Sequence, residues 1–166
     1  MKKFLFISVV IIVCGFDALA QTKINSCIKE INANQFYTSI GRFNSVGDFK
    51  YVGRRPVVIH FDANYAGPSR AMKPVLENYA NQYKSKVDFY RISITNENGD
   101  APEEIKLCEN MFVWLRKLNI PNSRTEGIPT LVFIRSDGNC STMIKGYSKE
   151  QGYDSKILSA IREISY

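Results

Sequence analysis

Several features that would point to common function classes are scarce or missing in this sequence of 166 residues. It has one histidine and four cysteines, and no two cysteines are spaced as Cys-x-x-Cys, so the residues of a zinc cluster are absent and we expect no metal and no cofactor. The densest basic spot is the pair Arg54 and Arg55, which argues against nucleic-acid binding. No apolar run reaches the about 20 residues of a membrane span, and we expect none.

The first 20 residues have the three parts of an export signal. Lys2 and Lys3 are basic, residues 4–13 form an apolar run interrupted only by Ser8, and Ala18-Leu19-Ala20 is a small-x-small cleavage site. Cleavage after Ala20 removes two of 22 basic and one of 16 acidic residues, which leaves a net charge of about +5. The sequence therefore predicts a periplasmic or secreted protein with a signal peptide over residues 1–20. Val13 is a poor fit before a lipid-modified cysteine, so we do not expect a lipid anchor at Cys14.

The predicted mature chain keeps three cysteines, which is an odd number in a compartment where thiols oxidise. They are Cys27, Cys108 and Cys140. We expect one long-range disulfide and one unpaired thiol, and the spacing leaves the pairing open. Cys108 falls on the apolar face of an expected helix, which predicts a place in the core.

With 45% hydrophobic and 23% charged residues, the chain has the composition of one globular domain. Residues 21–49 predict an irregular lead-in that includes a short helix over 24–31 and adds at most an edge strand. The remainder alternates short β-branched runs with amphipathic stripes in the order β-α-β-α-β-β-α. We expect helix starts capped by Asp100 and by a capping box of Ser148 and Gln151. This order predicts an α/β domain, a single mixed sheet flanked by helices on both faces.

Residues 57–70 read Val-Val-Ile-His-Phe-Asp-Ala-Asn-Tyr-Ala-Gly-Pro-Ser-Arg, and residues 127–130 read Gly-Ile-Pro-Thr. Together with the element order, these segments resemble thioredoxins, most closely the exported bacterial kind. The resemblance covers residues 50–166 and implies a thioredoxin fold over that range. It also implies thiol–disulfide exchange, which in this family depends on the motif Trp-Cys-Gly-Pro-Cys-Lys.

At the six positions that match this motif, both redox cysteines are missing. The residues there are Tyr65, Ala66, Gly67, Pro68, Ser69 and Arg70. Alanine has no nucleophile, and a serine hydroxyl stays protonated at neutral pH and forms no disulfide, so we expect no catalytic residue at either position.

The resemblance also assigns roles to residues outside the motif. His60 falls at the proton-relay position, where the family has a buried aspartate, and we expect it to form a structural hydrogen bond with Ser69. Ile128 and Pro129 match a cis-proline loop whose backbone edge docks extended peptides. Between helix and loop, the residues from Pro121 to Glu126 are an insertion that either reshapes this groove or is a tolerated surface loop.

The predicted function is therefore a redox-inactive, monomeric thioredoxin scaffold that binds an extended polypeptide or protein partner. Its predicted binding residues are Tyr65, Gly67, Pro68, Arg70, Ile128 and Pro129. One alternative is a thiol–disulfide oxidoreductase that uses Cys27, Cys108 or Cys140. Another is an engineered protein whose active-site cysteines were replaced at Ala66 and Ser69.

Overall fold

The structure is a computed structural model that describes residues 26–96 and 98–166. The predicted export signal, its cleavage site and Cys14 lie outside the described residues. Among those described, no helix has the length and apolar character needed to cross a membrane.

The described chain contains nine strands, four α-helices and one short 3₁₀ helix. The strands are β1 (Ile28–Glu30), β2 (Gly41–Phe43), β3 (Phe49–Tyr51), β4 (Val57–Asp62), β5 (Asp88–Ser93), β6 (Thr95–Asn96), β7 (Gly99–Asp100), β8 (Thr130–Ile134) and β9 (Cys140–Lys145). The α-helices are α1 (Ala33–Ser39), α2 (Gly67–Tyr83), α3 (Pro102–Lys117) and α4 (Tyr153–Ile164), and the 3₁₀ helix is η1 (Lys149–Gln151).

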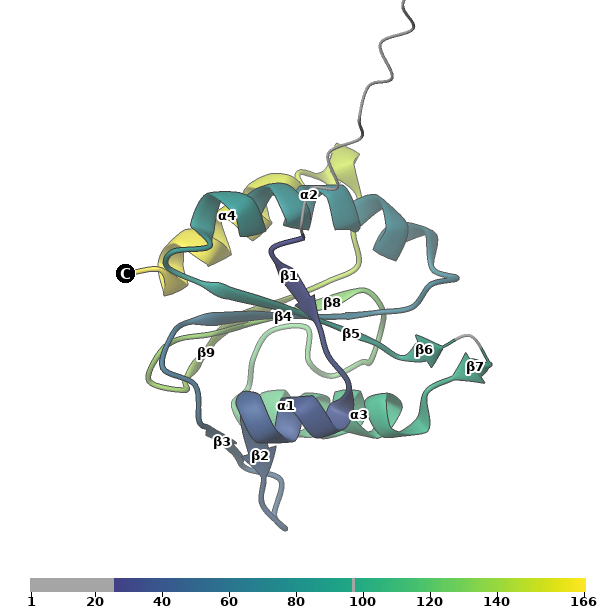
Figure 1. Ribbon diagram of the computed structural model, residues 1–166, viewed down its shortest axis with the longest axis vertical. Coiled ribbons are helices and arrows are strands. Elements are labelled where there is room, and N and C mark those ends of the chain that lie inside the picture. The colour runs from purple at the N-terminus through teal and green to yellow at the C-terminus, as the bar shows by residue number, and fades with distance from the viewer. Residues whose placement is uncertain (1–25, 97) are drawn as a thin grey trace, which may run out of the picture.

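Five strands form the central sheet in the order β1-β5-β4-β8-β9. β1, β5 and β4 run parallel, whereas β8 and β9 are antiparallel to their neighbours, so the sheet is mixed. α2 and α4 cover one face and α1 and α3 cover the other (Figure 1). This arrangement confirms the predicted architecture. The central strand β4 is buried along its whole length because helices cover both of its faces.

Each face of the sheet has its own apolar core. On the α1 and α3 face, Phe36, Ile59 and Phe112 belong to one buried cluster. On the α2 and α4 face, Val58 and Leu76 belong to the other. Neighbouring β4 residues point to opposite faces, so His60 and Asp62 share the face of Val58 and lie under α2.

The described part of the lead-in, residues 26–49, is more regular than the sequence predicted, and a helix over the described residues of the expected range 24–31 is wrong. Ile28–Glu30 is instead the edge strand β1, which pairs with β5, because strand pairing outweighs the weak local helix signal. The helix begins later, where Asn32 and Gln35 form a capping box ahead of α1. The antiparallel pair β2–β3 completes the segment.

Two predicted helix caps are also wrong. Asp100 belongs to β7, and α3 begins after Ala101 without a side-chain cap. Ser148 and Gln151 flank and end η1, while α4 begins after Gly152. Gly152 has a φ of 69°, which lets the chain turn from η1 into α4 at a position where a side chain would be strained.

Candidate functional site

The loop between β4 and α2 holds Tyr65 out into solvent. The Tyr65 residue is 70% exposed, although it lies between a fully buried strand and a helix. Arg70, one turn into α2, donates from Nη1 to the backbone oxygens of Asn64 and Tyr65, both at 3.0 Å. Arg70 thus fixes the loop, and the aromatic ring is presented by a braced backbone.

The first turn of α2 presents no exposed nucleophile. Ala66 is the N-cap residue and gives the helix no side-chain hydrogen bond, and Gly67 and Pro68 form the first turn. The side chain of Ser69 is buried, and its Oγ accepts a long hydrogen bond of 3.5 Å from the backbone N–H of Ala63. Ser69 therefore supports the loop from inside.

Ile128 and Pro129 lie at the same end of the sheet as this loop. Thr130, the first residue of β8, pairs with Phe61 near the end of β4, so the preceding two residues lie beside the chain that leaves β4. The Ile128–Pro129 peptide bond is cis, as the resemblance implies. The oxygen of Pro129 accepts from Gly146 at 2.8 Å, whereas the N–H and C=O of Ile128 have no hydrogen-bond partner among the described residues. Its backbone is thus an unpaired edge.

A small apolar cavity of about 120 Å³ adjoins Ile128. Ile94 and three residues of α3, Ile105, Cys108 and Phe112, supply most of its wall. Two carboxylates also line it, from Glu109 and Glu126. It is the size of a single side chain, and its wall combines apolar surface with negative charge.

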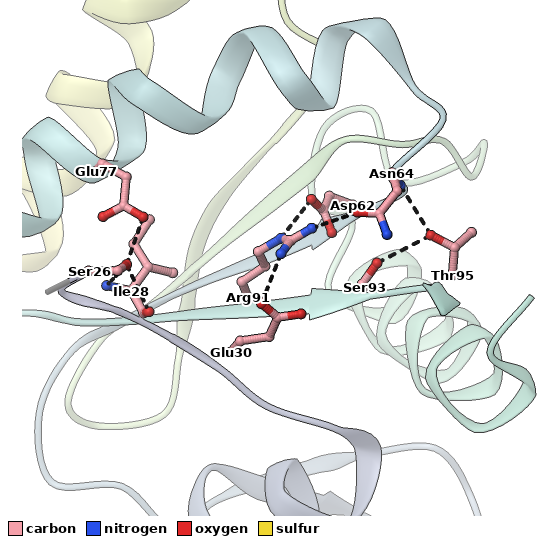
Figure 2. Close-up of polar contacts among 9 residues, drawn as sticks. All are labelled: Ser26, Ile28, Glu30, Asp62, Asn64, Glu77, Arg91, Ser93 and Thr95. Carbon is pink, nitrogen blue, oxygen red and sulfur yellow. Dashed lines mark hydrogen bonds and ion pairs between the residues drawn. The ribbon is translucent and has the colours of Figure 1, made fainter. Parts of the chain in front are cut away.

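A polar cluster lies behind the loop, centred on Arg91 of β5 (Figure 2). Its Nε donates to Asp62 Oδ2 at 2.8 Å, Nη1 donates to Glu30 at 2.9 Å and Nη2 donates to Asn64 at 3.0 Å. The backbone N–H of Asn64 in turn donates to Thr95 Oγ1 at 3.1 Å. Arg91 therefore connects β1, β4 and the loop that carries Tyr65.

The cluster stabilises a charge that burial alone would disfavour. Burial opposes the ionised form of Arg91, but the hydrogen bond and negative charge of Asp62, with a further contribution from Glu30, outweigh it and raise the pKa of Arg91. The second carboxylate oxygen of Asp62 is buried and has no partner in the described chain. No partner of Asp62 was predicted, although an acid that ends an apolar strand is a sequence signal for a buried ion pair.

His60 stands next to Arg91 on the neighbouring strand and is 3% exposed. The predicted hydrogen bond between His60 and Ser69 is wrong, because Ser69 bonds Ala63 and the Nε2 of His60 has no partner among the described residues. Burial lowers the pKa of His60 to about 3, with smaller contributions from the positive charges of Arg91 and Lys73. The imidazole is therefore neutral at physiological pH.

The three cysteines of the described chain are unpaired in the structure. Burial, with the nearby charges of Glu126 and Glu109, raises the pKa of Cys108 to about 12. Burial likewise raises the pKa of Cys140 to about 12. The Cys27 thiol donates to Asn81 Oδ1 at 3.0 Å. Neither Cys108 nor Cys140 has the lowered pKa of an exchange-active thiol.

Within residues 26–96 and 98–166, no group of three or more potential metal ligands comes together.

Comparisons with known proteins agree with this architecture. The family model described as Thioredoxin matches residues 46–113. A thioredoxin of Pseudomonas aeruginosa is 30% identical over 97 residues, which cover 58% of this chain and 71% of that protein. A thioredoxin of Borreliella burgdorferi is 22% identical over 127 residues, covering 76% of this chain and 92% of that protein.

Solved structures give the same result for the backbone. Thioredoxin O2 of Arabidopsis thaliana in its oxidized state has a TM-score of 0.54 at 22% identity, with 85% of this chain and 96% of that chain covered. A thioredoxin of Malassezia sympodialis has a TM-score of 0.52 at 23% identity, with 84% and 91% covered.

Proposed function

The chain belongs to the thioredoxin family and has its fold, and from this premise we propose that it is an exported, redox-inactive member that binds an extended polypeptide. The observation that carries the proposal is the pair of residues at the first turn of α2. There Ala66 and Ser69 occupy the positions that we match to the family's redox cysteines, and they offer no thiol. A scaffold that keeps the loop but has no reacting atoms is suited to binding.

The binding surface that we propose consists of Tyr65, Gly67, Pro68 and Arg70 on one side and Ile128 and Pro129 on the other. The unpaired backbone of Ile128 supports it, because an extended peptide adds to an exposed edge through main-chain hydrogen bonds that need no thiol. The exposed Tyr65 supports it as well, since tyrosine is enriched among residues that dominate binding energy. The apolar cavity beside Ile128 has room for one aliphatic side chain of the peptide.

Binding to a permanently unfolded polypeptide, such as reduced and carboxymethylated lactalbumin, tests this proposal. We expect Tyr65→Ala to weaken binding by about tenfold or more, because truncating a central aromatic typically removes that much affinity. Tyr166→Ala is the matched control, since Tyr166 is fully exposed and lies against Lys86, at the sheet end opposite Tyr65, and we expect it to change binding less than about twofold. Equal effects of the two substitutions, or no binding at all, would refute the proposed surface.

Export is the second part of the proposal, and it rests on residues 1–20 alone. Expression of the full chain in a bacterium with a periplasm is expected to give a periplasmic protein whose first residue is Gln21. N-terminal sequencing of the fractionated protein measures this directly. A cytoplasmic protein that keeps its N-terminus would contradict export and leave the binding proposal standing.

A further inference from the structure

The loop between α3 and β8 lines an open cavity of about 580 Å³ at the protein surface. Its wall combines the end of α3, the loop over 118–128 and the end of β9. This size falls within the range of about 300–1,000 Å³ for sites that hold small molecules. It is lined by Arg116, Asn119, Ile120, Pro121, Asn122, Ser123, Arg124, Thr125 and Lys145.

Three of these lining side chains are cationic, and none is acidic. Arg116 comes from α3, Arg124 from the loop and Lys145 from β9, so the charges enter the cavity from three separate elements. The remaining polar groups are hydroxyls and amides, which also bind oxyanions. Such a lining is complementary to a ligand with several negative charges.

The three cations are incompletely neutralised by their neighbours. Arg124 is exposed and has no ion pair or side-chain hydrogen bond within the described chain. Arg116 approaches Glu126 only to 3.7 Å, in a pair whose side chains are 36% and 53% exposed, so most of its donors stay available. Lys145 donates to neutral oxygens of Thr125, including the backbone oxygen at 3.1 Å, and keeps its full charge.

The loop that forms one wall is held in place by its own contacts. Ser123 is buried, and its Oγ donates to the oxygen of Ile120 at 2.6 Å. Asn119 and Asn122 have φ values of 54° and 66°, in the left-handed region that asparagine tolerates. Lys145 fastens the far side of the loop through Thr125. These contacts hold the loop, so ligand binding needs little reordering of its backbone, whereas the side chain of Arg124 is ordered on binding.

We propose that this cavity binds a small anion that carries two or more phosphoryl groups. The planar guanidinium groups of Arg116 and Arg124 match phosphoryl oxygens in geometry, and Lys145 adds a point charge. The volume is roughly twenty times the ~30 Å³ that one water molecule occupies in the liquid, so the cavity has room for more than one phosphoryl group. The site is separate from the Tyr65 surface and does not depend on the proposed peptide binding.

Isothermal titration of the purified protein with inorganic pyrophosphate is the first test. Arg124→Gln removes one cation that has no structural contact, and we expect it to weaken pyrophosphate binding by about tenfold or more, as for the loss of a charge-assisted hydrogen bond. Arg54→Gln is the matched control, because Arg54 is also exposed and precedes β4 at the sheet end opposite Lys145. We expect the control to bind within about twofold of the unsubstituted protein.

Two further measurements separate a built site from general attraction between opposite charges. Pyrophosphate is expected to shift the backbone amide resonances of residues 119–125 and not those around Arg54. Lack of binding at millimolar pyrophosphate, or equal weakening by both substitutions, would overturn the proposal. Binding to phosphatidylglycerol vesicles without binding to pyrophosphate would also overturn it, by assigning the cations to a membrane surface.

Discussion

Arg91 donates its Nε–H to Asp62 Oδ2 across 2.8 Å, in an ion pair whose side chains are only 14% and 6% exposed. The pair joins β5 to the end of β4, where the loop with Tyr65 begins. Removing one member of a buried pair leaves the other charge without compensation. The pair therefore links the stability of the sheet to the position of the candidate site.

We expect Asp62→Asn to lower the free energy of unfolding by about 3 kcal/mol, since the exposed carboxylate of Glu30 is then the one negative charge that Arg91 contacts within the described chain. Urea denaturation followed by the fluorescence of the buried Trp114 measures this loss. Asp88→Asn is the matched control, because it breaks the more exposed pair with Arg55 at 3.3 Å, and its expected cost is below about 1 kcal/mol. Similar losses for both variants would contradict a special role for the Arg91 pair.

Because burial lowers the pKa of His60, we expect the free energy of unfolding to depend on pH in a range where few other groups titrate. Its pKa is about 3 in the folded protein and about 6.5 when unfolded, so below pH 6.5 the unfolded chain takes up a proton that the folded chain refuses. Stability is therefore full above pH 6.5 and declines as the pH falls towards 3. Because His60 is the chain's single histidine, we assign to it a loss of about 2 kcal/mol between pH 7 and pH 5.

Urea denaturation at pH 7, 6 and 5 measures the effect of His60, with His60→Gln as the comparison. Glutamine keeps a polar side chain but does not titrate, so the variant is expected to lose most of the pH dependence in this range, whatever its absolute stability. A variant with the same slope as the unsubstituted protein would show that the dependence arises elsewhere.

The thiols of Cys108 and Cys140 are expected to react slowly with alkylating agents. With a pKa of about 12, roughly one thiol in 10⁴ is ionised at pH 8, and burial restricts access further. Mass-tag mapping after timed alkylation is expected to show both tags appearing only when urea is added. Rapid labelling of either cysteine in the folded protein would restore the alternative of thiol–disulfide exchange through these residues.

How far the sequence predicted the molecule depends on whether the signals were local. The β-branched runs and amphipathic stripes predicted the alternation of strands and helices, which the structure shows in the buried strand Val57–Asp62 and the helix Gly67–Tyr83, and Tyr65 and Ile128 were assigned to one surface by resemblance. The Asp62–Arg91 pair was missed because its partners are 29 residues apart and meet only through strand register. The His60–Ser69 hydrogen bond was predicted wrongly, because closeness in the fold does not determine which acceptor or donor a hydroxyl selects.

Placing thiols at Ala66 and Ser69 tests whether the first turn of α2 has the geometry for disulfide chemistry. Ala66 is the N-cap residue, where the unpaired N–H groups and the helix dipole lower the pKa of a thiol. Position 69 lies one turn further on, within reach for a disulfide. The double variant Ala66→Cys/Ser69→Cys is therefore expected to show a reversible two-electron couple between about −270 and −120 mV in thiol-trapping titrations.

The unsubstituted protein is expected to show no couple in that range, and the single variant Ala66→Cys is expected to give one fast-reacting thiol. These comparisons distinguish the contribution of the backbone geometry at the first turn of α2 from that of the thiols themselves. A couple in the unsubstituted protein would place redox activity at Cys27, Cys108 or Cys140 and contradict a redox-inactive function. A double variant that forms no disulfide would show that the first turn of α2 lacks the required geometry, and that matching its residues to the family's redox positions is wrong.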